Sequence, residues 1–347
     1  MAELFLARAE GPGGFEKRLV IKRILPHLSD DPDFIAMFLD EARIAAIFAH
    51  PHIVQVHAFG RAGGNYYPAM EVVHGPDLRR LNNVLVKLGR KLPLAICARV
   101  ISQVADALEY SHNASDPSGA PLNFLHRDVS PQNVLLSLDG VAKLIDFGVA
   151  KAAGHEHQTA AGSVKGKFAY MSPEQLGNRP LDKRCDIFGL GLVLYEMSCA
   201  VPAYRGESDI AVVKAAADAK FTPPKELRPD LPAELEAVLL KALQRDRDLR
   251  FQTAREMQKA LDRWLASLGN PMLPHEIAAF LAELQGEIDV PLDTTEWTGD
   301  RRTGTSKPPA KALPPPLPVV EEASSDWAGP PTDPSAPMPF HGEGNED

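Results

Sequence analysis

Three short stretches in a fixed order decide how this chain folds: His-Arg-Asp-Val-Ser-Pro-Gln-Asn at 126–133, Asp-Phe-Gly at 146–148 and Ser-Pro-Glu at 172–174. Upstream, Val-Ile-Lys at 20–22 ends an alternating apolar and polar segment, and Glu41 lies on the helical segment that follows. Any one triplet can arise by chance. Five pieces in this order, on elements of the right type, indicate one composite site.

The first 73 residues are predicted to form a sheet with one helix. Gly-Pro-Gly-Gly at 11–14 separates two alternating segments, which is typical of a hairpin. Asp31 as N-cap and Pro32 in the first helical position predict the start of the helix. The expected strands cover residues 3–8, 17–24, 53–58 and 66–73.

Helical patterns dominate after Gly75 and Pro76. The first long helix shows one apolar face, made of Leu94, Cys97, Ile101, Val104 and Leu108. Two short strands are expected around 133–137 and 141–145. Further helices are expected at about 183–199, 207–219, 232–244, 253–267 and 277–281.

Composition separates an almost neutral folded part from an acidic tail. The 347 residues carry a net charge of −9, and from residue 286 onward twelve Asp and Glu face four Lys and Arg, which leaves about −1 for the rest. Twelve of the 31 prolines lie from Pro291 onward, so we expect 288–347 to be a disordered tail. This distribution argues against a nucleic-acid partner.

The cysteines and the apolar segments point to a cytoplasmic protein. Cys97, Cys185 and Cys199 show no Cys-x-x-Cys spacing and are expected to be reduced core residues. No signal peptide is visible at the N-terminus. The longest apolar run, around 187–195, is shorter than the roughly 20 residues that a membrane span needs.

The ordered motifs resemble those of protein kinases, specifically the eukaryotic-like serine/threonine kinases of bacteria, over residues 1 to about 268. The resemblance implies an α+β fold with two lobes: a small antiparallel β lobe with one helix and a larger, mainly helical lobe. It also implies transfer of the γ-phosphate of ATP to protein hydroxyls with Mg²⁺. The implied segments are a small lobe at 1–73, a large lobe at 74–268, an accessory helix at 269–287 and the tail at 288–347.

The family's catalytic roles map onto five residues. Lys22 would hold the α- and β-phosphates, and Glu41 would orient its ammonium group. Asp128 would accept the proton of the substrate hydroxyl, while Asn133 and Asp146 would hold Mg²⁺ through hard oxygen ligands. Taken alone, Lys22 and Glu41 would be ordinary surface charges; the surrounding series favours the catalytic roles.

The resemblance also implies a nucleotide pocket. Met70 would be the gatekeeper, and backbone groups of Glu71 and Val73 would meet the adenine edge. The remaining implied contacts are Leu4, Val20 and Leu135 around the base and Asp77 at the ribose. Such apolar side chains are more often plain core.

Other family positions are structural. Glu174 is expected to pair with Arg250 in a buried ion pair, and Asp186 is expected to brace the catalytic loop. The segment at 172–174 belongs to the region where these kinases dock peptides. Its presence argues against a small-molecule kinase, which shares the Asp and Asn pattern but lacks such a segment.

The Gly-rich loop departs from the family pattern. Only its end is matched, with Ala2 at the third Gly and Leu4 at the following Val, so backbone N–H groups that would cover the phosphates are missing. Either the coding start is placed too late or the loop is lost. The intact downstream groups favour a late start.

Two further departures concern the substrate side. Ser130 stands where these kinases usually carry Lys, and Lys167 stands where they usually carry Thr. We hypothesise that Lys167 supplies the γ-phosphate contact that Ser130 cannot; two unrelated surface changes are the alternative. Because neither residue fits the usual diagnostic, the preference for Ser/Thr over Tyr rests on the overall resemblance.

Regulation and partners are also implied. Arg127 beside Asp128 predicts control by activation-loop phosphorylation, with Thr159 and Ser163 as candidate sites. The proline run at 314–318 could bind a polyproline-binding partner, although a plain flexible extension is the more ordinary interpretation. The main alternative to a kinase is a pseudokinase-like scaffold, and a third class is a small-molecule phosphotransferase.

Overall fold

A computed structural model describes residues 2–10, 12–24, 32–62, 65–116, 118–146 and 168–288. Its strands are β1 Ala2–Glu10, β2 Glu16–Ile24, β3 Val56–Ala62, β4 Asn65–Glu71, β5 Val134–Leu136 and β6 Ala142–Leu144. Its helices are α1 Pro32–Ile47, α2 Leu78–Lys87, α3 Leu94–His112, α5 Pro173–Leu176, α6 Arg184–Cys199, α7 Asp209–Ala217, α8 Pro224–Leu227, α9 Ala233–Ala242, α10 Ala254–Ser267 and α11 Pro274–Ala282.

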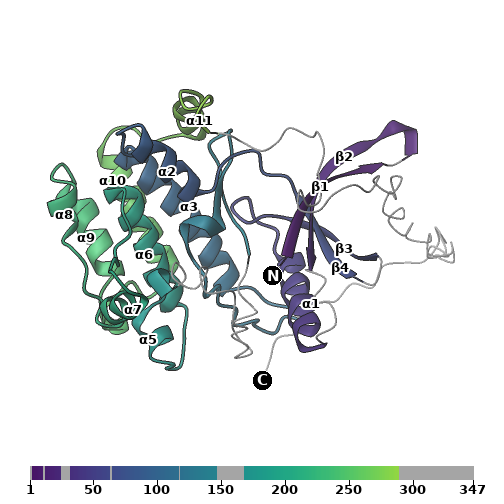
Figure 1. Ribbon diagram of the computed structural model, residues 1–347, viewed down its shortest axis with the longest axis horizontal. Helices are drawn as coiled ribbons and strands as arrows, with labels where there is room; N and C mark the ends of the chain where they lie inside the picture. The colour runs from purple at the N-terminus through teal and green to yellow at the C-terminus, as the bar shows by residue number, and fades with distance from the viewer. Residues whose placement is uncertain are drawn as a thin grey trace, which may run out of the picture. The chain divides into compact units, whose positions relative to one another are not determined.

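The first part of the chain forms a four-stranded antiparallel sheet in the order β1-β2-β4-β3. The expected hairpin is confirmed: β1 and β2 pair along their whole length, with Leu4 opposite Lys22. Helix α1 packs on β3 and β4 (Figure 1), and its residues Phe38 and Ala42 are buried. Helix α1 begins at Pro32 as expected, whereas the proposed N-cap Asp31 lies outside the described residues.

Helices make up most of the second part (Figure 1). Helix α6 is buried along nearly its whole length and packs against α3 and α9, because its sequence is apolar on every side. Helices α3 and α10 also pack together, so α3 lies at the centre of the core. The α+β architecture with a small β lobe and a larger helical lobe is thus confirmed.

The expected helix after 269 is present and continues the core. In α11, Ile277 and Leu281 are fully buried, and Ile288, where the tail was expected to begin, is also buried. Gly140, between β5 and β6, has φ +82°, and a Cβ there would lie 1.9 Å from the carbonyl oxygen of Pro274. The remainder of the predicted tail lies outside the described residues.

A buried ion pair closes the large lobe. Arg250 donates to Glu174 through Nη1–Oε1 at 2.6 Å and Nη2–Oε2 at 2.8 Å, as expected from the sequence. Burial alone would raise the pKa of Glu174, but the hydrogen bonds and charge of Arg250 outweigh it and hold that pKa below its usual value. Within the described residues, no helix is both long and apolar enough to cross a bilayer.

Candidate functional site

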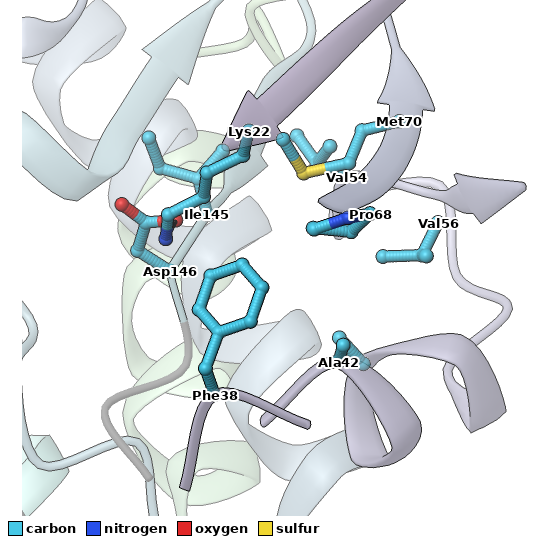
Figure 2. Close-up of a pocket in the computed structure, with 10 residues that line it drawn as sticks. Lys22, Phe38, Ala42, Val54, Val56, Pro68, Met70, Ile145 and Asp146 are labelled. Carbon is cyan, nitrogen blue, oxygen red and sulfur yellow. Dashed lines mark hydrogen bonds and ion pairs between the residues drawn. The ribbon is translucent and has the colours of Figure 1, made fainter. Parts of the chain in front are cut away.

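The site begins with an ion pair between the two parts of the fold. Lys22 Nζ, near the end of β2, lies 2.7 Å from Asp146 Oδ1, just after β6. Figure 2 shows the two side chains facing each other beside Ile145. The Lys22 side chain is mostly buried, whereas that of Asp146 is 43% exposed. The structure therefore brings together two residues that are 124 positions apart and that the sequence assigned to one site.

Asp128 and Asn133 form the second pair of the site. Asn133 Nδ2 donates to the carbonyl oxygen of Asp128 at 2.8 Å and to its Oδ2 at 3.3 Å. Asn133 also accepts the N–H of Ile145, at 2.9 Å, through its own carbonyl. Because Ile145 directly precedes Asp146, this bond holds the Asp128–Asn133 turn next to the Lys22–Asp146 pair.

A buried carboxylate positions the loop that carries Asp128. Asp186 accepts the N–H of His126 at 2.8 Å, the N–H of Arg127 at 2.7 Å, and Nε2 of His112 at 2.8 Å. Burial alone would raise the pKa of Asp186, but the hydrogen bond and charge of His112, with the charge of His126 and the Arg127 N–H, keep it lowered. The bracing role expected for Asp186 matches this geometry.

The backbone is strained at two positions beside these groups. Arg127 has φ +62° and Asp146 has φ +53°, which lie in a backbone region that residues other than glycine rarely adopt. Such strain persists only where surrounding contacts over-determine the conformation. Here the contacts are the bonds from Asp186 to the Arg127 N–H and from Lys22 to Asp146.

A small apolar cavity adjoins the Lys22–Asp146 pair. It is lined by both residues together with Phe38, Ala42 and Ala45 of α1 and with Met70, and it encloses about 40 Å³ (Figure 2). That volume holds only a few waters. It is therefore a small recess, and Lys22 and Asp146 form part of its lining.

Three residues expected around the base share one face of the sheet. Val20 pairs with Met70, and Leu4 pairs with Lys22. Cross-strand partners project to the same side of a sheet, and residues two apart on one strand share a face. The side chains of Leu4, Val20, Met70 and Lys22 therefore all face the site. Leu4 is 61% exposed, and Leu6 on the same face is 40% exposed.

The segment between β4 and α2 carries the other expected contacts. Val73 lies in this connection, and among the described residues its N–H has no hydrogen-bond partner. Asp77 bridges to Leu135 on β5. Its side chain caps α2 by accepting the N–H of Arg80 at 2.9 Å, so Asp77 has a helix-capping role that the sequence did not suggest.

The donor set suits a hard cation held mainly by a ligand. Asn133 uses Nδ2 on Asp128, which leaves its carbonyl Oδ1 as an acceptor, and Asp146 adds a carboxylate. Among the described residues there is no group of three or more His, Cys, Asp and Glu that could hold a metal ion alone. Mg²⁺ typically takes one or two carboxylates and completes its shell with phosphates and water. The residues present therefore fit Mg²⁺ bound with a nucleotide.

Several predicted residues cannot be placed. Lys167, Thr159 and Ser163 lie outside the described residues, as do Phe147 and Gly148 of the second motif. Glu41 lies on α1, but its side chain is not among those described.

Two side-chain clusters were not predicted from the sequence. Lys143 Nζ on β6 lies 2.7 Å from Glu71 Oε1. Tyr170 donates to Glu196 and accepts from Arg79 of α2, and burial raises the pKa of Glu196. Neither cluster has a spacing signal, because the partners are brought together only by the tertiary fold.

The chain is similar in sequence to known proteins over most of its length. Residues 15–262 match the protein kinase domain family. MasK of Myxococcus xanthus, named a tyrosine-protein kinase, is 45% identical over 83% of this chain and 44% of its own length. PknH of Mycobacterium bovis, named a serine/threonine-protein kinase, is 30% identical over 94% of this chain and 50% of its own. This chain thus spans about half the length of these relatives or less.

Solved structures agree with the sequence relatives. The crystal structure of the PknI kinase domain of Mycobacterium tuberculosis superposes with a TM-score of 0.56 at 28% identity. The superposition covers 76% of this chain and 90% of the PknI chain. The likeness therefore includes both the small β lobe and the helical lobe.

Proposed function

Because this chain belongs to the protein kinase family, with its eukaryotic-like bacterial members among its relatives, we propose that it transfers the γ-phosphate of ATP to protein hydroxyl groups. The observation that carries the proposal is the meeting of Lys22 with Asp146, next to the Asp128–Asn133 turn. Lysine, amide and carboxylate groups at one cleft are the parts that phosphoryl transfer requires.

Each residue has a proposed task. Lys22 binds the α- and β-phosphates once a nucleotide enters, and its ammonium then shares its charge between them and Asp146. Asn133 Oδ1 and Asp146 would hold Mg²⁺, and the cation would reduce the negative charge of the phosphates. The side chains of Leu4, Val20 and Leu135 enclose the base beside the gatekeeper Met70, while backbone groups of Glu71 and Val73 bind its edge.

Asp128 is the proposed base. Its carboxylate accepts from Asn133 Nδ2, which fixes its orientation, and Asp186 fixes the backbone on its N-terminal side. A substrate hydroxyl hydrogen-bonded to Asp128 would therefore be aimed at the γ-phosphorus. It would pass its proton to the carboxylate as the new P–O bond forms and the bond from the γ-phosphorus to the bridging oxygen breaks, with ADP as the leaving group.

Several finer parts of the proposal come from the sequence. They are the orienting role of Glu41, the γ-phosphate contact of Lys167, and control through phosphorylation at Thr159 or Ser163. Reduced, buried cysteines favour a cytoplasmic location. We also propose that the substrates are proteins and that the tail binds a polyproline-binding partner.

Serine or threonine is the proposed acceptor. The named serine/threonine kinases among the relatives support it, whereas the name of MasK favours tyrosine. Phosphoamino-acid analysis of labelled protein separates the two: phosphoserine or phosphothreonine supports the proposal, and phosphotyrosine alone would contradict it.

The test of the function uses the full chain with Mg²⁺ and γ-labelled ATP. Thermal stabilisation by MgATP and label on protein are expected. Stabilisation and label on a metabolite, with none on protein, would indicate a small-molecule phosphotransferase. The absence of both stabilisation and label would leave the scaffold interpretation.

A further inference from the structure

Glu71 joins three segments at the edge of the cleft. At the end of β4, its Oε1 accepts the N–H of Gln55 at 2.8 Å and Nζ of Lys143 at 2.7 Å. Its own N–H donates to the carbonyl oxygen of Gln55 at 2.9 Å. Glu71 is thereby fixed to the segment that precedes β3, and its ion pair with Lys143 connects it to β6 in the large lobe.

Lys143 lies on the face of the β5–β6 hairpin that bounds the proposed nucleotide site. It pairs across the hairpin with Leu135, so both side chains leave the hairpin on the same side. The neighbours Ala142 and Leu144 point the other way and are fully buried. Asp146 follows three residues after Lys143, so a shift of β6 relative to β4 would move both the floor of the base pocket and Asp146.

A backbone seam runs beside this ion pair. Val54 N–H donates to the carbonyl oxygen of Leu144 at 3.0 Å, and Leu144 N–H donates to that of His52 at 2.9 Å. His52 Nδ1 also lies 3.0 Å from the carbonyl oxygen of Ala142. The seam attaches β6 to the chain just before Gln55. The Glu71–Lys143 pair extends the same attachment to β4, which the seam does not reach.

The exposure of the pair suits a contact that can open. The two side chains are 24% and 18% exposed, in contrast to the fully enclosed Glu174–Arg250 pair. A partly solvated pair loses less on separation than a buried one, because water can take the place of the partner. Lobe opening can therefore break this pair without leaving a desolvated charge.

We propose that Glu71 and Lys143 form a latch that sets the spacing between β4 and the β5–β6 hairpin and so regulates nucleotide affinity. The proposal rests on the proposed function of the site. Both side chains are positioning groups: with the latch closed, the base lies between Val20 above and Leu135 below, and Asp146 faces Lys22. With the latch open, the slot widens and the nucleotide leaves faster.

The test measures MgADP binding by calorimetry on the full chain, together with KM for ATP and kcat. Lys143→Met removes the cation and keeps the length of the side chain; we expect its MgADP dissociation constant and KM to rise about fivefold, with kcat changed less than about twofold. Lys143→Arg retains the charge and should recover most of the affinity. Glu71→Gln keeps an acceptor for the Gln55 N–H while weakening the pair.

A double-mutant cycle and a matched control complete the test. If the pair acts as a unit, Glu71→Gln in the Lys143→Met background adds little further loss. Lys225→Met breaks a comparable ion pair, with Glu236 at 3.0 Å in the large lobe, and should leave MgADP binding unchanged. Raised salt should weaken MgADP binding more in the wild-type protein than in Lys143→Met, because only the wild-type protein has an ion pair that salt can screen.

Three results would overturn the latch. They are wild-type affinity in Lys143→Met, losses in the double variant that equal the product of the single losses, and an equal loss in Lys225→Met. Failure of the proposed function is distinguishable, because the wild-type chain would then transfer no label from ATP to protein, whatever its affinity for MgADP.

Discussion

Arg250 and Glu174 form a two-bond ion pair in which both side chains are almost completely enclosed. Arg250 also donates to the carbonyl oxygens of Gln244, Arg184 and Arg245, and its guanidinium lies 4.6 Å from the ring centre of Phe188. The pair thus connects α5, the start of α6 and the α9–α10 connection. Every nitrogen of this buried cation is satisfied.

Removing one partner of this pair should be strongly destabilising. We expect Arg250→Met to lower the free energy of unfolding by about 3–5 kcal/mol, because Glu174 is left buried and uncompensated. Urea unfolding of the full chain measures the change. Lys225→Met, in a far more exposed pair, should cost less than about 1 kcal/mol. Equal effects of the two substitutions would show that burial does not govern the pair.

Acid should weaken the fold through Asp186 and Glu174. Both pKa values are lower in the folded protein than the ordinary value, so these groups stabilise the fold above their unfolded-state pKa of about 4, and the stabilisation is lost as pH falls below it. We expect the free energy of unfolding to fall between about pH 5 and pH 3. Asp186→Asn should flatten this dependence; a slope identical to that of the wild-type protein would contradict the assignment.

Helix α11 should be an integral part of the large lobe. We expect Gly140→Ala to cost about 1–3 kcal/mol more than Gly89→Ala, because both positions have positive φ but only the Cβ at 140 meets backbone, 1.9 Å from the Pro274 oxygen. The difference in unfolding free energy isolates the contact with α11. Equal costs would mean that α11 yields without resistance.

Lys167 should be needed for phosphoryl transfer. We expect Lys167→Met to lower kcat by at least about 10²-fold while MgATP binding persists, because a cation near the γ-phosphate acts mainly as charge transfers. Adding Ser130→Lys, which places a cation on the described loop beside Asp128, should restore part of the rate. Unchanged turnover in Lys167→Met would end this hypothesis.

Sequence alone predicted the two-lobed α+β fold and several of its contacts. The β1–β2 hairpin followed from alternation around Gly13, and the approach of Lys22 to Asp146 followed from the motif order. The Glu174–Arg250 pair was also expected and is confirmed. The hairpin follows from a local turn signal, whereas the two side-chain pairs follow from positions that the family resemblance implies.

Other features could not be predicted, because they depend on distant packing. Nothing near Lys143 in the sequence indicates that it pairs with Glu71, 72 residues away, and the cap that Asp77 forms on α2 competes with its expected ribose role. The small cavity beside Met70 is lined in part by Ala42 and Ala45 of α1, so it exists only where α1 packs against the sheet. Such contacts are visible only once both lobes are folded.

The most direct test of the account compares transfer of γ-labelled phosphate by the full chain and by Asp128→Asn, with MgATP binding measured on both. We predict transfer to protein by the wild-type chain and a loss of at least about 10³-fold in Asp128→Asn, with MgATP affinity retained. Equal transfer by both proteins, or none by a wild-type chain that binds MgATP, would contradict the claim that Lys22, Asp128, Asn133 and Asp146 serve one reaction.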